Sequence, residues 1–498
     1  KEYRRQRQMC IRDSLGIGAY DSLSTTRARY YDNYGFADVF AALTRAPNSL
    51  QARIAALDGV AAAETRIEEV ALADLPGMAE PVSVRLVSLP DHQPNALNRL
   101  YLRAGRLPEP EADEAVASAG FAAAHHLTEG GQIRVLINGK LRGIRIVGTA
   151  LSPEFIYALG PGALMPDDRR HGILWLPEKM IAPAYNLDGA FNSVSLKLIP
   201  GIRPELVLPA LDRLLARYGG RGAYARKDQQ SHAFLDAELR QLQAMSRILP
   251  PIFLLVSVFL VNMTLSRLIV LEREQIGLLK AMGYAAFAVG WHYVKFVTLI
   301  ALAGIAIGFL AGTWLGAGMT RLYAEFFSFP FLVFSRNPAV YAIAAAATYA
   351  AAILGALQAV RGVARLSPAA AMAPPLPPRY RRVLGGRLDL SPYVRQSSVI
   401  VTRHLTHWPA RTLGGMFGMA LATAILVGSL WSFGSIDHMI DVTFRRSDRQ
   451  DASIAFTEAR PVSALYALRR LPGILQAEPY RAVSVKLRNG PAERRVTL

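Results

Sequence analysis

One short segment holds the side chains of this chain that are best suited to bind a partner. Residues 271–284 read LEREQIGLLKAMGY, so charged and amide groups open the segment, apolar groups follow, and glycine comes near its end. This pattern predicts a short amphipathic helix over residues 272–283, and its mixed side chains suit a docking surface. The alternative is a solvated turn without a partner. The candidate contact residues are Glu272, Arg273, Glu274, Gln275, Ile276, Gly277, Leu278, Leu279, Lys280, Met282 and Gly283.

Motifs for phosphate, metal or nucleophile chemistry are absent from the sequence. Without a GxxxxGKS or GxxxxGKT loop, the chain does not bind ATP in the manner of P-loop ATPases, and HExxH, CxxC and GxSxG are missing too. His125 and His126 are adjacent, so their side chains point to different faces of most elements. Residues 167–171, DDRRH, predict a solvated loop. We therefore expect no catalytic residue, metal or cofactor, which argues against a membrane-anchored enzyme.

Long apolar stretches flank the docking segment. Helices that cross the ~30 Å hydrocarbon core need about 20 mostly apolar residues. The sequence therefore predicts an α-helical membrane protein with four transmembrane helices in this chain, at residues 248–265, 296–320, 339–360 and 413–433. Pro250 and Pro251 stand at the entrance of the first stretch, where a break or kink is expected.

The charge distribution predicts which side of the membrane each segment faces. The formal net charge is +18, but it is concentrated in loops, which favours a membrane protein over a nucleic-acid-binding protein. Residues 361–411 hold nine arginines against one acid, Asp389, so this linker is expected in the cytoplasm. Residues 267–295 then lie inside, while residues 15–247 and 435–498 lie outside. The alternative is the inverted orientation.

The membrane stretches are rich in glycine and poor in charge. Gly304, Gly308, Gly312 and Gly316 recur every four residues, which places them on one helix face where another helix can approach closely. Loose packing is the alternative. No Asp, Glu, Lys or Arg lies in the last three stretches, and ionisable groups at such depth usually mark ion or proton pathways. This argues against an ion channel and a proton-coupled carrier.

The outer residues predict mixed α+β domains. A compact β-α-β unit is expected from a strand at 36–42, a helix at 47–57 and a strand at 63–70. Further short strands are predicted at 85–88, 132–137, 144–147, 172–176 and 192–198. A helix over 231–248 leads to the first membrane stretch, with Phe234, Leu239, Leu242 and Met245 as its packed face.

The β-α-β pattern returns near the end of the sequence. Pro461, Ser463, Leu468, Leu471, Gly473, Ile474 and Glu478 stand at the offsets of Pro47, Ser49, Ile54, Leu57, Gly59, Val60 and Glu64. Each copy opens a predicted outer domain, which favours duplication. A chance match of two generic units is the alternative.

A family resemblance joins these features. The REQIGLLKAMG run at residues 273–283, the glycine-rich stretch, a short aromatic turn, a further apolar stretch and RLSPAAAM at 365–372 together resemble the FtsX-like permease domain. This is the membrane subunit of MacB-type and lipoprotein-release-type ABC transporters. The resemblance covers residues 231–374 well. More loosely, residues 15–230 are similar to the periplasmic domain of that group.

The resemblance implies a function. Residues 272–283 are then the coupling helix that docks on a separate ABC ATPase subunit, which binds the ATP, in the bacterial inner (plasma) membrane. ATP hydrolysis would drive movement of the periplasmic domains and export or release of a substrate. Further implied partners are the lipid bilayer, a second permease half or subunit, and a periplasmic protein, with no nucleic acid. The alternative is an FtsX-like signalling scaffold that activates a periplasmic cell-wall hydrolase.

The expected organisation follows from these predictions. Residues 1–14, which contain the single cysteine Cys10, resemble a translated sequencing adapter rather than native sequence. The following parts are the MacB-like periplasmic domain at 15–230, the stalk and three-helix membrane domain at 231–374, the basic linker at 375–412, the fourth membrane helix at 413–433, and the start of a second periplasmic domain at 434–498. We expect a fragment of a longer protein, truncated at both ends.

Overall fold

The structure is a computed structural model that divides into two compact units. The helical unit comprises residues 247–313 and 338–454, and the sheet unit comprises residues 20–246, 314–333 and 456–497. The predicted foreign segment at 1–14 and most of the basic linker at 375–412 lie outside the described residues. The structure describes residues 20–497 except 79, 91–96, 162, 164, 334–337, 366, 370–400, 402–404, 406–408, 448, 455, 457–459, 481–483 and 491.

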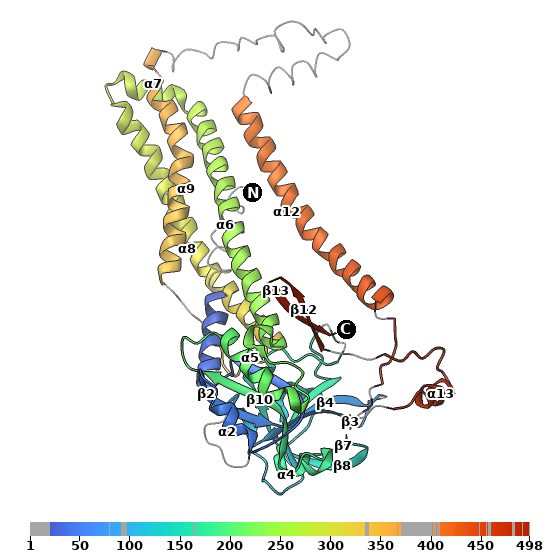
Figure 1. The fold of residues 1–498 in the computed structure, drawn as a ribbon. Coiled ribbons are helices and arrows are strands. Elements are labelled where there is room, and N and C mark those ends of the chain that lie inside the picture. Colours follow the sequence, from blue (N-terminus) through green and yellow to red (C-terminus); the bar gives the residue numbers. More distant parts are fainter. Residues whose placement is uncertain are drawn as a thin grey trace. The chain divides into compact units, whose positions relative to one another are not determined.

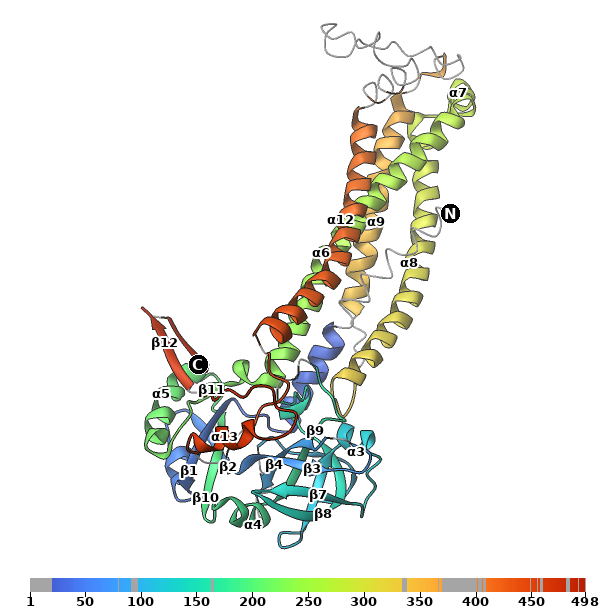
Figure 2. The same cartoon turned by 90° about the vertical axis from the view of Figure 1, so that its right-hand side faces the viewer.

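Among the described residues, four helices are long and apolar enough to cross a membrane, which confirms the predicted four. They are α6 (Gln230–Leu271), α8 (Ala286–Phe326), α9 (Pro338–Arg365) and α12 (Pro409–Asp441). Within the helical unit α6, α8 and α9 run side by side (Figures 1 and 2). The short helix α7 (Arg273–Ala281) joins α6 to α8 at one end of this bundle.

Of the break or kink predicted at Pro250 and Pro251, the break does not occur, because α6 continues through both prolines as one helix. The kink stays a prediction. Each proline lacks the N–H that a carbonyl of the preceding turn would accept. Apolar helices tolerate this loss where neighbouring groups satisfy the freed carbonyls. At 1.5 Å per residue, the 42 residues of α6 extend over about 63 Å. That is roughly twice the hydrocarbon thickness of a bilayer.

A seven-stranded sheet in the sheet unit closes into a barrel through six of its strands, and the seventh, β5, pairs only with β8 among the described strands. Its order is β5-β8-β6-β9-β4-β3-β7, and β8 also pairs with β7. Residues 140–145 of β8 pair with β7, while residues 145–150 pair with β6 along the opposite edge. The strands are β3 (Glu68–Asp74), β4 (Val82–Leu89), β5 (Tyr101–Gly105), β6 (Glu114–Ser118), β7 (Gln132–Ile137), β8 (Lys140–Leu151) and β9 (His171–Pro177).

The barrel interior is filled by alternate side chains of its strands, as the two-residue period of a strand requires. Val84, Val135 and Leu174 belong to this buried core. Two short helices, α3 (Ala119–Ala124) and α4 (Glu178–Ile181), add Phe121 and Ile181 to it.

A second sheet has the order β11-β1-β10-β2, with β1 (Val39–Pro47), β2 (Val60–Arg66), β10 (Ala190–Leu198) and β11 (Tyr224–Ala225). The predicted β-α-β unit is present as β1, α2 (Leu50–Ala55) and β2, but its strands are not neighbours. Both pair antiparallel with β10, which lies between them. The strand predicted at 63–70 is in fact two strands, β2 and β3. Helices α2 and α5 (Pro204–Leu215) bury Leu50, Ile54, Val207, Leu211 and Leu215 against this sheet.

A third core in the sheet unit joins the ends of three helices. Residues 20–33 form a helix whose Leu23 and Tyr30 are buried in one cluster with Leu235 of α6 and Phe327, which follows α8. Arg27 of the first helix and Asp236 of α6 form an ion pair at 2.9 Å. The ends of α6 and α8 are therefore held in the same packed cluster.

The predicted packed face of α6 is partly wrong. Leu239 is buried and Leu242 packs against the same cluster, as expected. Phe234 is 43% exposed although its ring stacks on Tyr157, and Met245 is 50% exposed. The buried face also includes Leu235, because the helix at 20–33 packs on that side of α6. The sequence of α6 alone does not show where this helix packs.

The run at residues 167–171 is not wholly a solvated loop. His171 begins β9 and is 7% exposed, and the Asp168 carboxyl lies against Gly120, since a Cβ there would be 2.1 Å from Asp168 Oδ2. Burial raises the pKa of Asp168 and lowers the pKa of His171 to about 4. Parallel pairing of β9 with β4 draws this end of the run inside.

The second copy of the repeat is present in its helix and glycine. Helix α13 (Ser463–Arg469) stands at the offset of α2, and Gly473 has a φ of 90° where Gly59 has 89°. Among the described residues of 449–480 no strand flanks α13. In the first copy both flanking strands pair with β10, and the strands described after α13, β12 (Ser484–Asn489) and β13 (Ala492–Thr497), pair with each other.

Candidate functional site

Helix α7 starts directly after α6 without an intervening loop. The N–H of Glu272 donates to the carbonyl of Leu268 at 3.0 Å, which completes α6. The N–H of Ile276 then donates to the carbonyl of Glu272 at 3.0 Å, which opens α7. The chain turns at Glu272 alone, so any displacement of α7 acts on the end of α6.

The far end of α7 is closed by a glycine motif. Gly283 has a φ of +94°, in the left-handed region that glycine favours. Its N–H donates to the carbonyl of Lys280, and the N–H of Tyr284 donates to the carbonyl of Leu279, both at 3.1 Å. These two bonds define a Schellman motif, which fixes the end of a helix. The glycine noted in the sequence therefore has a structural role.

One face of α7 is held by the bundle. Ile276 is 2% exposed and Gly277 is buried. Ile276 shares a core with residues of three helices: Leu265 and Ile269 of α6, Val289, Tyr293, Val297 and Ala301 of α8, and Ala352 and Ala356 of α9. Through Ile276, α7 therefore belongs to one packed core with all three helices.

Glu272 belongs to the held side of α7. Its Oε2 accepts a hydrogen bond from the hydroxyl of Tyr293 at 2.6 Å. Hydrogen bonds to a carboxylate are among the stronger ones in proteins. Glu272 therefore ties the start of α7 to α8, a role that the sequence did not indicate because Tyr293 lies 21 residues further on.

The opposite face of α7 is open. Glu274 and Gln275 are exposed, as are Leu278 at 55%, Leu279 at 36% and Met282 at 60%. Arg273 and Lys280 are half-buried. Three apolar side chains beside a carboxylate and an amide give a surface with both hydrophobic area and hydrogen-bonding groups, as docking surfaces have.

The open face continues beyond the predicted segment. Tyr284 is 57% exposed, and Phe287 and Trp291, at the start of α8, stack with ring centroids 6.2 Å apart. Aromatic residues are enriched at interfaces. Their i, i+4 spacing on an otherwise apolar helix is the signal that could have added them to the candidate contact residues.

The predicted glycine ladder lies on α8. Gly308, Gly312 and Gly316 are buried and Gly304 is half-buried, but a Cβ at Gly304 or Gly316 would meet no atom within 4 Å. Its helix–helix role stays a prediction.

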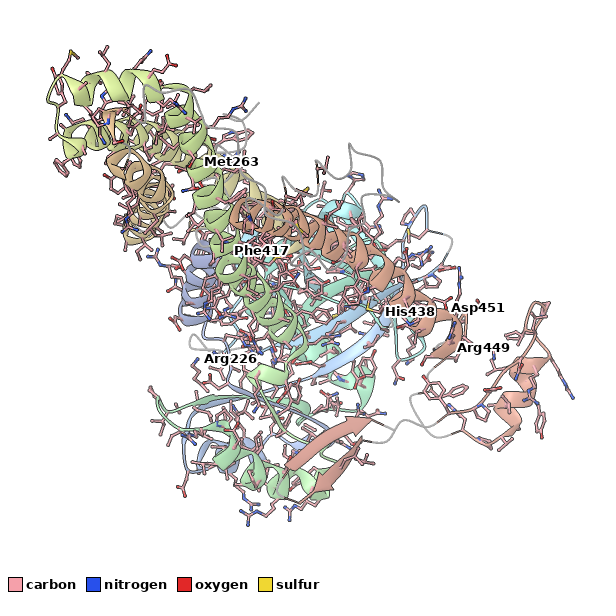
Figure 3. All side chains as sticks on the ribbon, turned by 90° about the horizontal axis from the view of Figure 1, so that it is seen from above. Arg226, Met263, Phe417, His438, Arg449 and Asp451 are labelled. Carbon is pink, nitrogen blue, oxygen red and sulfur yellow. The ribbon has the colours of Figure 1, made fainter. Side chains whose placement is uncertain are left out.

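Close approaches of helices occur at other glycines. A Cβ at Gly355 of α9 would lie 2.7 Å from the carbonyl oxygen of Val258 in α6, and one at Gly414 of α12 would lie 2.5 Å from the ring of Phe259. Met263 and Phe417, which Figure 3 labels on α6 and α12, are 39% and 53% exposed. Gly414 therefore allows α12 to approach Phe259 of α6 closely.

The site has binding groups rather than reactive ones. Among the described residues no group of three or more His, Cys, Asp and Glu side chains could hold a metal. His125 Nε2 lies 2.9 Å from the carbonyl oxygen of Arg169. The sheet unit has a polar cavity of about 340 Å³, whose lining includes Asn48, Gln51 and Glu64. The open face of α7 remains the feature with the clearest capacity to bind a partner.

Comparison with known proteins places this site in a family. The FtsX-like permease C-terminal model matches residues 247–368. No curated protein matches the chain. The extracellular domain of the ABC-type transporter YknZ from Gram-positive bacteria is similar at 11% identity and a TM-score of 0.27, over 38% of this chain and 98% of that one. The periplasmic region of MacB from Actinobacillus actinomycetemcomitans is similar at 9% identity and 0.28, over 43% and 97%.

The matched residues contain the features of the helical unit described above. They include α7, the core around Ile276 and the close contact at Gly355. Residues 247–368 of this chain are therefore similar to the C-terminal domain of FtsX-like permeases.

Proposed function

We propose that this chain is the permease subunit of an ABC transporter in which a separate ATPase subunit docks on the open face of α7. The family match supports a permease role in general. The observation that carries the docking is the division of α7 into a held face around Ile276 and an open face around Leu278. A helix fixed on one side and exposed on the other can receive force without being displaced from its bundle.

The connections of α7 favour transmission of that force. It follows α6 without a loop, and Tyr293 ties it to α8. Both α6 and α8 continue into the sheet unit, where their ends share one packed core. We infer that ATP hydrolysis on the partner moves these helices and, through them, the sheet unit.

The proposal includes a location and further partners. The charge of the basic linker favours α7 in the cytoplasm and the sheet unit in the periplasm, with the bacterial inner membrane between them. No residue in the apolar window of α12 is fully buried within the described part of this chain. Lipid and a second permease half or subunit suit that surface, and the driven movement would export a substrate or release it from the membrane.

A pair of leucine substitutions tests the docking. Leu278→Asp places a charge on the open face, while Leu206→Asp places one on α5, where the leucine is 70% exposed. Both variants of the tagged chain are purified from membranes, and vanadate-sensitive ATP hydrolysis is measured in the purified fraction. We expect Leu278→Asp to lower that activity at least tenfold, because a desolvated charge in an interface costs several kcal/mol.

The control keeps folding and docking apart. Leu206→Asp should retain the activity of the unmodified chain, and both variants should be recovered from membranes in equal amounts. If Leu278→Asp retains full ATP hydrolysis, the ATPase does not dock on α7 and the proposal is wrong.

A further inference from the structure

Residues 152–157 connect the barrel to the ends of two long helices. The segment follows β8 and contains one 3-10 turn, η1 (Pro153–Phe155). Ser152 Oγ accepts a hydrogen bond from the N–H of Glu154 at 3.3 Å, which fixes the turn. All the contacts described below lie within the sheet unit.

The segment is bonded to the start of α6. Gln229 Nε2 donates to the carbonyl of Glu154 at 2.8 Å, and the N–H of Tyr157 donates to Ser231 Oγ at 2.9 Å. The ring of Tyr157 stacks on Phe234 with centroids 4.9 Å apart. Figure 3 labels Arg226, which lies just ahead of this point in the chain.

The segment is also bonded to the residues that follow α8. The N–H of Ser328 donates to the carbonyl of Ile156 at 2.9 Å, and the Tyr157 ring lies 5.4 Å from the ring of Phe327. Ile156 itself is 1% exposed. The ends of α6 and α8 are therefore bonded to adjacent residues of one short segment.

The side chain of Glu154 extends from this segment to the boundary of the two sheets. Its carboxylate accepts two hydrogen bonds from the Arg66 guanidinium of β2, at 2.6 Å from Nη1 and 2.8 Å from Nη2. Arg66 Nη2 also contacts Glu68 of β3 at 2.8 Å and Ser195 of β10 at 3.1 Å. Arg66 and Glu154 are 4% and 5% exposed.

The two ends of this connection differ in strength. Breaking a buried ion pair by losing one partner destabilises a protein far more than losing a neutral hydrogen bond does. Glu154 therefore stays with Arg66 when the helix ends move, and the segment follows the helices through its hydrogen bonds with Gln229, Ser231 and Ser328 and through the ring contacts of Tyr157.

We propose that residues 152–157 are a coupling bridge: they convey displacement of the α6 and α8 ends to Arg66, and so to the boundary between the barrel and the four-stranded sheet. Glu154 and Arg66 are positioning residues in this bridge. The inference rests on the proposed function for the source of the movement, but the bridge itself is a physical connection that can be tested without nucleotide.

The test weakens the bridge at its helix end, where the fold is least affected. Ser231→Ala removes the acceptor for Tyr157. Gln229→Glu removes the donor to Glu154 but keeps the oxygen that accepts from the N–H of His232 at 2.7 Å. Asp236→Asn on α6 is the matched control. It weakens the ion pair between α6 and Arg27 of the helix at 20–33, but Asp236 is not part of the bridge. Ser231→Thr keeps the hydroxyl.

Hydrogen exchange of the full chain in lipid nanodiscs gives the first result. Without nucleotide, Gln229→Glu with Ser231→Ala should raise the exchange rates of residues 152–157 and of β2 at least twofold together. Asp236→Asn should leave β2 unchanged, and Ser231→Thr with native Gln229 should show native rates. Unchanged exchange in β2 of the double variant would overturn the bridge.

Vanadate-trapped ATP with the co-purified ATPase gives the second result. In the unmodified chain, exchange should change in both α7 and β2, and the double variant should retain the change in α7 but lose at least half of that in β2. A full change in β2 of the double variant overturns the bridge. No change in α7 of the unmodified chain overturns the proposed function instead, while the nucleotide-free result still decides the bridge.

Discussion

Glu64 on β2 is a nearly buried carboxyl group. It is 4% exposed, and its Oε2 accepts a hydrogen bond from the N–H of Leu97 at 2.5 Å. Burial raises the pKa of this carboxyl to about 7, although Arg66 nearby lowers it. The folded chain therefore binds the Glu64 proton more tightly than the unfolded chain, whose carboxyl titrates near 4.5.

The sign of the pH effect follows. Protonated Glu64 favours the folded state at low pH, and this stability is lost as pH rises from about 4.5 to about 7, by roughly 3 kcal/mol at most. Glu64→Gln keeps an acceptor for Leu97 but cannot ionise. We expect the variant to unfold at a higher temperature than the unmodified chain at pH 8, and not at pH 5, by scanning calorimetry. Equal differences at both pH values would contradict the assignment.

Gly283 offers a second residue-level prediction. Gly283→Ala places a Cβ on a left-handed residue, which costs roughly 1–2 kcal/mol, so the last turn of α7 should fray. Hydrogen exchange of residues 279–284 should rise severalfold. Gly318→Ala is the control, because a Cβ there meets no atom within 4 Å and the residue lies inside α8. If exchange at 279–284 stays native in Gly283→Ala, the Schellman motif does not hold this end of α7.

At the scale of elements, the contact of α6 with α9 depends on one small residue. The Val258 carbonyl oxygen is backbone and cannot rotate away from a Cβ at Gly355. Asn262 Nδ2 donates to the Gly355 carbonyl at 3.1 Å, so the same site also carries a hydrogen bond between the helices.

Gly355→Ala should therefore separate α6 from α9 and destabilise the bundle by roughly 1–3 kcal/mol. Gly304→Ala is the matched control, because its Cβ has open space in this chain. Thermal unfolding in detergent should show a lower midpoint for the first variant alone. If a second permease subunit packs on the glycine ladder, Gly304→Ala should instead reduce recovery of the assembled pair.

The sequence indicates elements better than it indicates their neighbours. Charge-free runs were sufficient to predict the four long helices, and β7 has the bounds that alternation predicted, Gln132–Ile137. The prolines did not break α6, because an apolar helix tolerates proline where neighbouring groups satisfy the freed carbonyls. Strands β5 and β6 were missed. In β6, a glutamate in the strand argued against a buried element, but Glu114 is 1% exposed and its ion pairs with Arg106 and Arg145 make that burial tolerable.

Helix α7 also shows that the sequence predicts an element better than its packing. Its bounds of Arg273–Ala281 lie inside the predicted 272–283. Periodicity shows that a helix has apolar faces, but Ile276 and Leu278 are equally apolar. Only the packing of α8 and α9 determines that the first is buried and the second is open.

At the scale of the whole molecule, the basic linker predicts opposite sides for α7 and the sheet unit. The sequence has one cysteine, Cys10, so Cys10→Ser gives a background for single labels. Leu278→Cys on α7 and Leu206→Cys on α5 both replace exposed leucines. In intact spheroplasts, a membrane-impermeant maleimide should label position 206 at once and position 278 only after permeabilisation. The reverse pattern would establish the inverted orientation.

The split sheet has a consequence for how the chain acquires its structure. Strands β1 and β2 cannot form their pairings with β10 until β10 has been synthesised, more than 120 residues after β2. The barrel is built from the contiguous residues 68–177 between them. Closing long loops is entropically unfavourable and slows folding. During synthesis and passage across the membrane, the barrel should therefore form first, and β1 and β2 stay unpaired and vulnerable to aggregation or proteolysis until β10 arrives.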